Sequence, residues 1–333
     1  MDIRNTRQLK EFSAGRLANA REGQKIILYF SLITIAVTAL ANVASYILSQ
    51  QIAKTGGLGS MGVRSALTTV QTLLPFVQAV FLMCLTLGYL ATMLRIARGQ
   101  YASPNGMRLG FDRFWVLLRC TLLKGLIFGG VAVASLYVAM MIYMMTPLSN
   151  SAVDILMPLV KSAGTSGQLG IMLDDATYTQ LMSATTPAMA IFGVLFLVLA
   201  APLFYRYRMT DYLIIDRPGT GALAALRDSR MMMKGNRWNL FRLDLSMWWY
   251  YAAVLVSAAI AYGDQLLPAL GISLPFSDTA AYFVFFGVYL AVIFAVYYFL
   301  RNRVEVTYAL AYDSLRPQEP ENNGAVLGNI FQM

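Results

Sequence analysis

The stretch IILYFSLITIAVTALANVASYIL, residues 26–48, decides the fold because it contains no charged side chain. A helix of roughly 20 apolar residues is long enough to cross about 30 Å of hydrocarbon. This run is too long for the core of a signal peptide, and it follows a charged lead that has no obvious cleavage site. We therefore expect a retained signal anchor, the first of several membrane helices.

Five further apolar runs continue the pattern. They cover residues 73–94, 125–145, 188–205, 247–262 and 280–300. The composition agrees, since 58% of the residues are hydrophobic and only 13% are charged, whereas a soluble domain has about 25% charged residues. The sequence predicts an all-α, polytopic membrane helix bundle within residues 26–316, with six transmembrane helices and additional interfacial helices on the cytoplasmic side.

The positions of the cations predict the orientation. Six spans divide the rest of the chain into segments that lie alternately on the two sides of the membrane. One side holds all Lys and Arg residues except Lys54, Arg64 and Lys161, and such an excess marks the cytoplasmic side. We expect both termini inside. The net charge of +9 then meets anionic inner-leaflet headgroups at about 1 kcal/mol per cation, and no nucleic-acid partner is needed to explain it.

Three segments flank or interrupt the spans. Residues 1–25 predict a short basic amphipathic helix on the inner leaflet, with a plain solvated helix as the alternative. The external loop 147–187 predicts two amphipathic helices resting on the outer leaflet; capping of the bundle or contact with an external ligand is the other interpretation. The tail 317–333 is polar and rich in Pro and Asn, and we expect it to be disordered.

The residue types argue against several chemistries. The chain has no histidine, the commonest general base near neutral pH and the commonest metal ligand. Cys84 and Cys120 have no CxxC neighbour, so we expect neither a disulfide framework nor a zinc site. The carboxylates of Asp211, Asp216 and Asp244 are too far apart in sequence to resemble an acid–base pair. We expect no enzyme activity, no metal and no cofactor.

The segment MKGNRWNLFRLDLSMWW, residues 233–249, places cations and an aspartate directly before an apolar run. We interpret 216–219 as a turn and Thr220–Met233 as a surface helix stopped by Gly235. The chain then re-enters the membrane. Asp244 lies awkwardly near the start of this span, and we expect it to pair with Arg242 or Arg237.

A weak internal repeat follows the fourth and sixth spans. RYRMTDYLIID, residues 206–216, and RVEVTYALAYD, residues 303–313, share Arg, Thr, Leu and Asp at the same offsets. The shared residues are Arg206, Thr210, Leu213 and Asp216, and Arg303, Thr307, Leu310 and Asp313. These offsets lie on one helical face, so we expect each helix to continue out of the bilayer. Chance is the competing explanation.

Polar side chains also occur inside two spans. Thr38 and Asn42 lie on one face of the first, and Gln71 and Gln78 lie on either side of a proline in the second. They could form a polar path or ligand pocket between these spans. Hydrogen bonding between helices is the structural alternative, and we favour it.

Residues 212–249 carry a resemblance to a known family. A D-x-P turn (Asp216, Pro218) is followed by a helix with Ser229 and Gly235, and then by an entry segment with Trp238, Phe241, Asp244 and Ser246. This pattern resembles the bacterial integral-membrane family catalogued as domain of unknown function 975. The motifs RQLKEFSAGRL, GFDRFW and YALAYDSL support the match along nearly the whole chain. The resemblance implies a six-span protein of the bacterial cytoplasmic membrane and no known activity.

Three classes of function remain open. The first, which we favour, is a non-catalytic membrane protein that is envelope-associated or accessory to a transport system, with a membrane protein as its partner. The second is a carrier or exporter of a lipid or an amphipathic peptide, which can work without ion-coupling residues. The third is an intramembrane enzyme that uses carboxylates.

Overall fold

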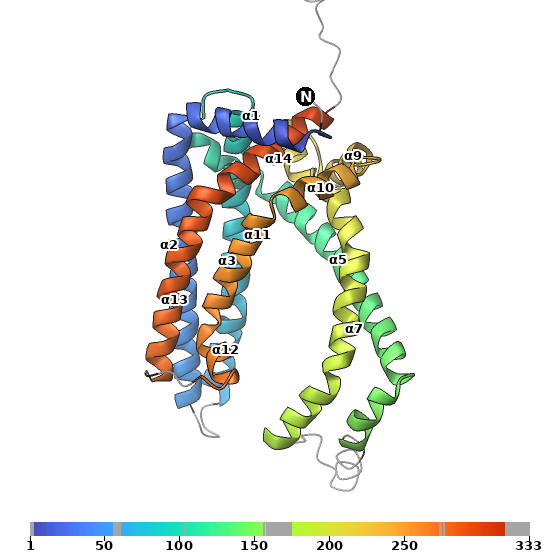
Figure 1. Ribbon diagram of the computed structural model, residues 1–333. Coiled ribbons are helices and arrows are strands. Elements are labelled where there is room, and N and C mark those ends of the chain that lie inside the picture. Colours follow the sequence, from blue (N-terminus) through green and yellow to red (C-terminus); the bar gives the residue numbers. More distant parts are fainter. Residues whose placement is uncertain are drawn as a thin grey trace, which may run out of the picture. The chain divides into compact units, whose positions relative to one another are not determined.

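The computed structural model describes residues 3–55, 61–102, 104–155, 157, 175–272, 275 and 277–316. Within these ranges the elements are helices, without a strand. The tail 317–333 and residues 158–174 of the loop 147–187 lie outside the described residues. The elements in chain order are α1 (Thr6–Asn19), α2 (Arg21–Lys54), α3 (Met61–Ala97), η2 (Pro104–Arg108), α4 (Leu109–Asp112), α5 (Phe114–Met144), η3 (Pro147–Ser149), α7 (Asp175–Tyr207), α8 (Thr210–Asp216), α9 (Ala222–Met232), α10 (Arg237–Ser246), α11 (Trp248–Ala261), α12 (Gly263–Ala269), α13 (Asp278–Ala295), η4 (Val296–Arg301) and α14 (Asn302–Leu315) (Figure 1).

Five helical stretches of the described chain are long and apolar enough to cross a membrane, and the bent pair α10–α11 makes a sixth if it is counted as one span. The expected runs 26–48, 73–94, 188–205 and 280–300 fall inside α2, α3, α7 and the α13–η4 pair. The runs 125–145 and 247–262 coincide with parts of α5 and α11 but extend one residue past the end of α5 and one residue past each end of α11. Large apolar side chains stay exposed along these helices, for example Leu40 at 72% and Leu126 at 75%. A soluble protein does not expose apolar faces of this extent, so the structure indicates a membrane-embedded helical protein.

Helices α2 and α3 extend well beyond the apolar runs from which they were predicted. α2 has 34 residues and α3 has 37, so each is more than about 50 Å long at 1.5 Å per residue. The hydrocarbon accounts for roughly 30 Å of that length. The remaining turns continue outside the apolar layer, where charged residues such as Arg95 can lie.

The chain divides into two compact units. One unit consists of residues 119–208, which contain most of α5 together with η3 and α7. Its small core is formed by Tyr143, Ala152 and Ala188, with Ala184 and Ile191 packed against them. The Tyr143 hydroxyl donates a hydrogen bond to the Ala184 carbonyl at 2.8 Å, which ties α5 to α7.

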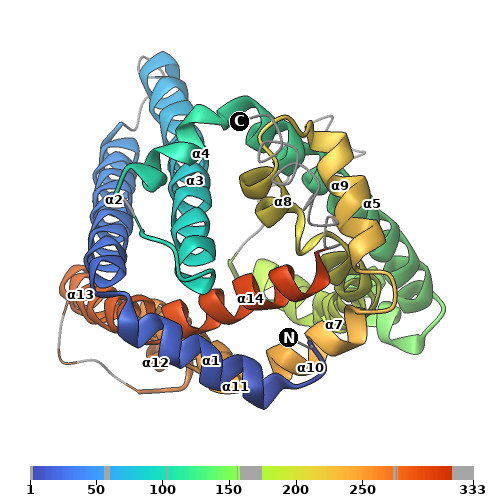
Figure 2. The same cartoon turned by 90° about the horizontal axis from the view of Figure 1, so that it is seen from above.

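The other unit combines residues 1–118 with residues 209–333. Helix α2 packs along α3, and α13 packs against α11 and α2. At one end of these helices lies a layer formed by α1, α8, α9, α10 and α14, which we call the end layer (Figures 1 and 2). The polar residues described below belong mostly to this layer.

Helix α14 is the centre of the end layer. It contacts α1 and α3, and in Figure 2 α1 lies along it. Most of its side chains are buried, including Tyr308 and Tyr312. The buried face of α1 carries Leu9 and Ser13, and the Thr307 hydroxyl donates to the Ser13 hydroxyl at 3.0 Å. Leu9 of this lead helix is therefore buried in protein, whereas the sequence predicted an amphipathic helix lying on the inner leaflet.

Two glycines let a short segment approach α3 closely. The first is Gly88 on α3, where a β-carbon would collide with the backbone of Met107. The second is Gly110 on α4, where a β-carbon would collide with the backbone of Cys84. Since backbone cannot move aside as a flexible side chain can, η2 and α4 depend on these two positions.

The segment that enters the fifth span is bent. Helices α10 and α11 meet at Met247 at an angle of 64°. The expected surface helix before it is also present, as α9, and Gly235 adopts a positive φ of 84° in the following turn. That conformation favours glycine, so Gly235 suits the turn between α9, which ends at Met232, and α10.

Candidate functional site

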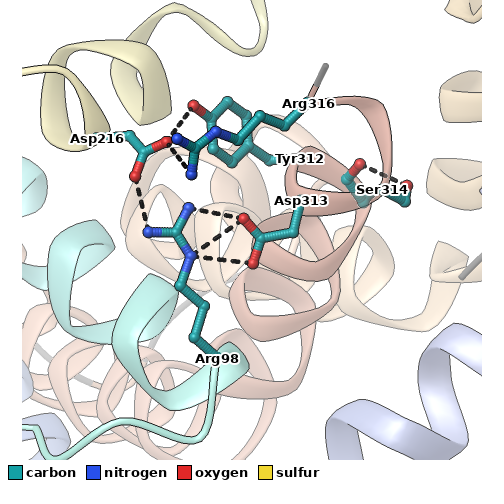
Figure 3. A network of polar contacts seen from close by, with 7 residues as sticks. Arg98, Asp216, Tyr312, Asp313, Ser314 and Arg316 are labelled. Atoms are coloured by element: carbon teal, nitrogen blue, oxygen red, sulfur yellow. Dashed lines mark hydrogen bonds and ion pairs between the residues drawn. The ribbon is translucent and has the colours of Figure 1, made fainter. Parts of the chain in front are cut away.

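Arg98, the residue that follows α3, joins two helices of the end layer, α8 and α14, to the end of α3 (Figure 3). Its Nη1 lies 2.7 Å from Asp216 Oδ1 at the end of α8. Its Nη2 lies 2.7 Å from Asp313 Oδ1 on α14, and its Nε is 3.1 Å from both oxygens of the same carboxylate. The planar guanidinium thus binds one carboxylate through a fork and a second through its remaining edge.

Asp216 has further partners. The Tyr312 hydroxyl donates to its Oδ2 at 3.0 Å, and Arg316 Nη1 lies 3.1 Å from the same oxygen. The Asp216 side chain is only 7% exposed. A carboxylate so shielded from water needs partners of this kind to remain charged. We call the five residues the Arg98 network: Arg98, Asp216, Tyr312, Asp313 and Arg316.

The charges of the Arg98 network balance, with two guanidinium groups facing two carboxylates. Partial burial disfavours the charge on Arg98, but the hydrogen bonds and charges of Asp313 and Asp216 outweigh burial and raise the pKa of its guanidinium above the ordinary value. Arg98 is therefore permanently charged. The arrangement can hold helices together, and its carboxylates are engaged with cations.

The network also gives the internal repeat a physical meaning. Asp216 and Asp313 occupy the same offset in the two copies, and both bind the same guanidinium. The matching threonines, Thr210 and Thr307, are both buried. The second copy lies within α14, as expected. The first copy is instead divided between the end of α7 and α8 by a turn at residues 208–209.

Asp244 is buried at 8% exposure near the bend between α10 and α11. It accepts a hydrogen bond from the Tyr308 hydroxyl of α14, which also lies 2.8 Å from the Tyr251 hydroxyl. The sequence analysis named Arg242 or Arg237 as the partner. Arg242 is exposed and two residues away, so it faces elsewhere on α10, and Arg237 lies about two turns away, at roughly 10 Å of rise.

The other residues of the family segment divide between the interior and the surface. Ser229 is fully buried in α9, whereas Pro218 and Trp238 are exposed. The rings of Trp238 and Phe241 stack with centroids 5.1 Å apart. The Ser246 carbonyl accepts from Lys10 Nζ at 2.6 Å, and partial burial lowers the pKa of that lysine. The segment thus connects α1 and α14 on one side and presents aromatic rings on the other.

A second polar region lies among α2, α11, α12 and α13, around a cavity of about 440 Å³. Thr38 and Asn42 line it, as do four tyrosines and Asp264 from the later helices. Gln71 and Gln78 lie on α3 and are not among its lining residues. Thr38 and Asn42 therefore line this cavity without the two glutamines, and a polar path between the first two spans stays a prediction.

The described residues contain no group of three or more His, Cys, Asp or Glu side chains that could hold a metal ion. Both cysteines are buried, and they form no disulfide with each other.

Arg98, Tyr308, Tyr312 and Arg316 were not singled out from the sequence. The motif YALAYDSL contains both tyrosines, but its role was not apparent because the partners lie about 60 and 100 residues earlier. A usable signal existed for Arg98. Arg98 follows the second span, on the same expected side of the membrane as Asp216 and Asp313, which follow the fourth and sixth spans. Two carboxylates close together there need a cation to offset their charge.

A family model described as "Protein of unknown function (DUF975)" matches residues 1–309. This confirms the resemblance seen in the sequence. No curated protein and no solved structure matches the chain.

Proposed function

The chain therefore belongs to this family of unknown function, and on that premise we propose that it is a non-catalytic, integral protein of the bacterial cytoplasmic membrane. We assign it an accessory role, in which the end layer is a fixed platform for a membrane protein partner, such as a transport system. Six spans with both termini inside place this layer on the cytoplasmic side, where the positive-inside rule puts the cations.

The observation that carries the proposal is the engagement of the buried carboxylates. Asp216 is held by Arg98, Arg316 and Tyr312, and Asp244 accepts from Tyr308. A general acid or base must reach a substrate proton through an open position. These two carboxylates instead connect helices, which favours a holding role over catalysis.

The test is gentle extraction of the full-length protein from its native membrane, followed by mass spectrometry of co-purifying polypeptides. We expect one polypeptide at fixed stoichiometry, with less of it retained by Asp216→Asn, which loosens the end layer. Asp228→Asn is the matched control, because its ion pairs of 3.5 and 3.9 Å are weaker and more exposed. Extraction of the wild-type protein without any stoichiometric partner would contradict the accessory role.

The cavity beside α2 favours a second candidate, a carrier or exporter of a lipid or amphipathic peptide. Its lining combines the polar Thr38 and Asn42 with the apolar Val254 and Ile293, a mixture suited to an amphipathic molecule. The same extraction tests this candidate through small molecules retained by the protein. Asn42→Leu should release such a molecule, whereas Gln78→Leu, outside the cavity, should not.

A further inference from the structure

A strongly basic cavity of about 410 Å³ lies at the junction of α9 and α10. Its lining residues are Arg227, Arg230, Met231, Lys234 and Arg237. A spacing of three residues places Arg227 and Arg230 on one side of α9, and Lys234 follows in the turn after this helix. The turn at Gly235 then adds Arg237, so that four cations of one short segment surround one cavity.

Little negative charge offsets these cations. Asp228 approaches Arg227 at 3.9 Å, but it also lies 3.5 Å from Arg217. Arg230, Lys234 and Arg237 take part in none of the ion pairs among the described residues. Like charges around one cavity repel each other, and a bound anion would relieve that repulsion.

Arg237 adds a second, independent observation. Its Nε atom is buried, and no described residue accepts a hydrogen bond from it. Arg237 is also the first residue of α10, whose N-cap Asn236 makes no side-chain capping bond. The Asn236 side-chain oxygen instead accepts a hydrogen bond from the side-chain amide of Asn239, with Nδ2 at 3.4 Å. Buried donors normally have an acceptor, and a helix N-terminus favours an anion.

We propose that this cavity binds a phosphate group, with Arg230, Lys234 and Arg237 as its main donors. Arginine and lysine both bind phosphate oxygens through charge-assisted hydrogen bonds. The phosphate can belong to a phospholipid headgroup or to a soluble compound. Met231 in the lining and the exposed Trp238 nearby in sequence give a lipid chain apolar neighbours, which favours the headgroup.

The test uses the full-length protein in dodecyl maltoside micelles at constant ionic strength. Native mass spectrometry counts the ligands bound from three titrations: dioctanoylphosphatidylglycerol, dioctanoylglycerol, which lacks phosphate, and inorganic phosphate. The variants are Arg230→Gln and Lys234→Gln, both at exposed positions where folding is not at stake. Arg242→Gln is the matched control, since it removes one exposed arginine of α10 from outside the cavity.

We expect one phosphatidylglycerol per protein, bound about tenfold more weakly by each cavity variant and unchanged by Arg242→Gln. Inorganic phosphate that binds with the same sensitivity would support the site and identify a soluble source. Phosphate that fails to bind while phosphatidylglycerol binds would support the headgroup. Equal weakening by Arg242→Gln, equal binding of dioctanoylglycerol, or no binding of either phosphate ligand would overturn the proposal.

Discussion

At the scale of single residues, Arg98 is the cation that connects α8 and α14 of the end layer. It follows α3, and its two partners lie 118 and 215 positions later in the chain. A forked contact to Asp313 fixes its orientation, and the contact to Asp216 uses what remains. Such a guanidinium cannot be replaced by an ammonium without loss of geometry.

Arg98→Gln should lower the free energy of unfolding by roughly 2 kcal/mol, because two shielded carboxylates lose their shared cation. The measurement is unfolding in mixed micelles of rising dodecyl sulfate fraction. Arg64→Gln, at an exposed position outside the network, should have no comparable effect. Combining Arg98→Gln with Asp216→Asn should cost less than the sum of the two single changes; strict additivity would show that the pair does not interact.

Tyr308→Phe should also destabilise the protein, by about 1–3 kcal/mol, because it leaves the buried Asp244 without the hydroxyl that donates to it. Asp244→Ala should reduce stability or membrane insertion for the same reason. Both are read in the same unfolding assay, with Tyr29→Phe as the control at a ring that is 54% exposed. If Asp244→Ala folded normally and lost a measured activity, Asp244 would have a functional role instead.

Single positions differed in how far the sequence could predict them. Asp244 was recognisable because a carboxylate beside an apolar run is costly and needs a partner, and Asp216 was recognisable from the family motif and the internal repeat. The partners were not recognisable, because Tyr308 meets Asp244 and Arg98 meets Asp216 only in the folded chain. Pairing within α10 was the natural expectation, but helix geometry points Arg242 away from Asp244.

At the scale of elements, the close approach of α4 to α3 depends on Gly110. Gly110→Ala should destabilise the protein by about 1–3 kcal/mol, since its β-carbon would meet the Cys84 backbone. Gly130→Ala on α5 is the matched control, because a β-carbon there has open space. Equal stability of the two variants, measured by thermal melting in detergent, would show that α4 does not pack closely on α3.

The helices themselves could be predicted, because uncharged apolar runs of this length require backbone hydrogen bonds satisfied within one segment. Their ends could not. Hydropathy marks where hydrocarbon ends, while the helices of this chain continue for several turns beyond it. The bend at Met247 was missed as well, since no proline or glycine occupies that position.

At the scale of the whole molecule, the distribution of cations predicts the orientation, and cysteine labelling can test it. Both native cysteines are buried, at 1% and 0% exposure, so their background labelling should be low. In intact cells a membrane-impermeant maleimide should label Lys54→Cys and leave Arg227→Cys unlabelled. Permeabilised cells should label both. The reverse pattern would mean that both termini lie outside.

The packing of α1 against α14 has a consequence for biosynthesis. A ribosome releases α1 first, yet its contact through Ser13 waits for Thr307, nearly 300 residues later. Until then the Arg98 network also lacks Tyr312, Asp313 and Arg316, and the incomplete chain is exposed to degradation and misassembly. Completion of α14 thus distinguishes a finished chain from an unfinished one. We expect truncated chains that end before α14 to be degraded faster than the full-length protein.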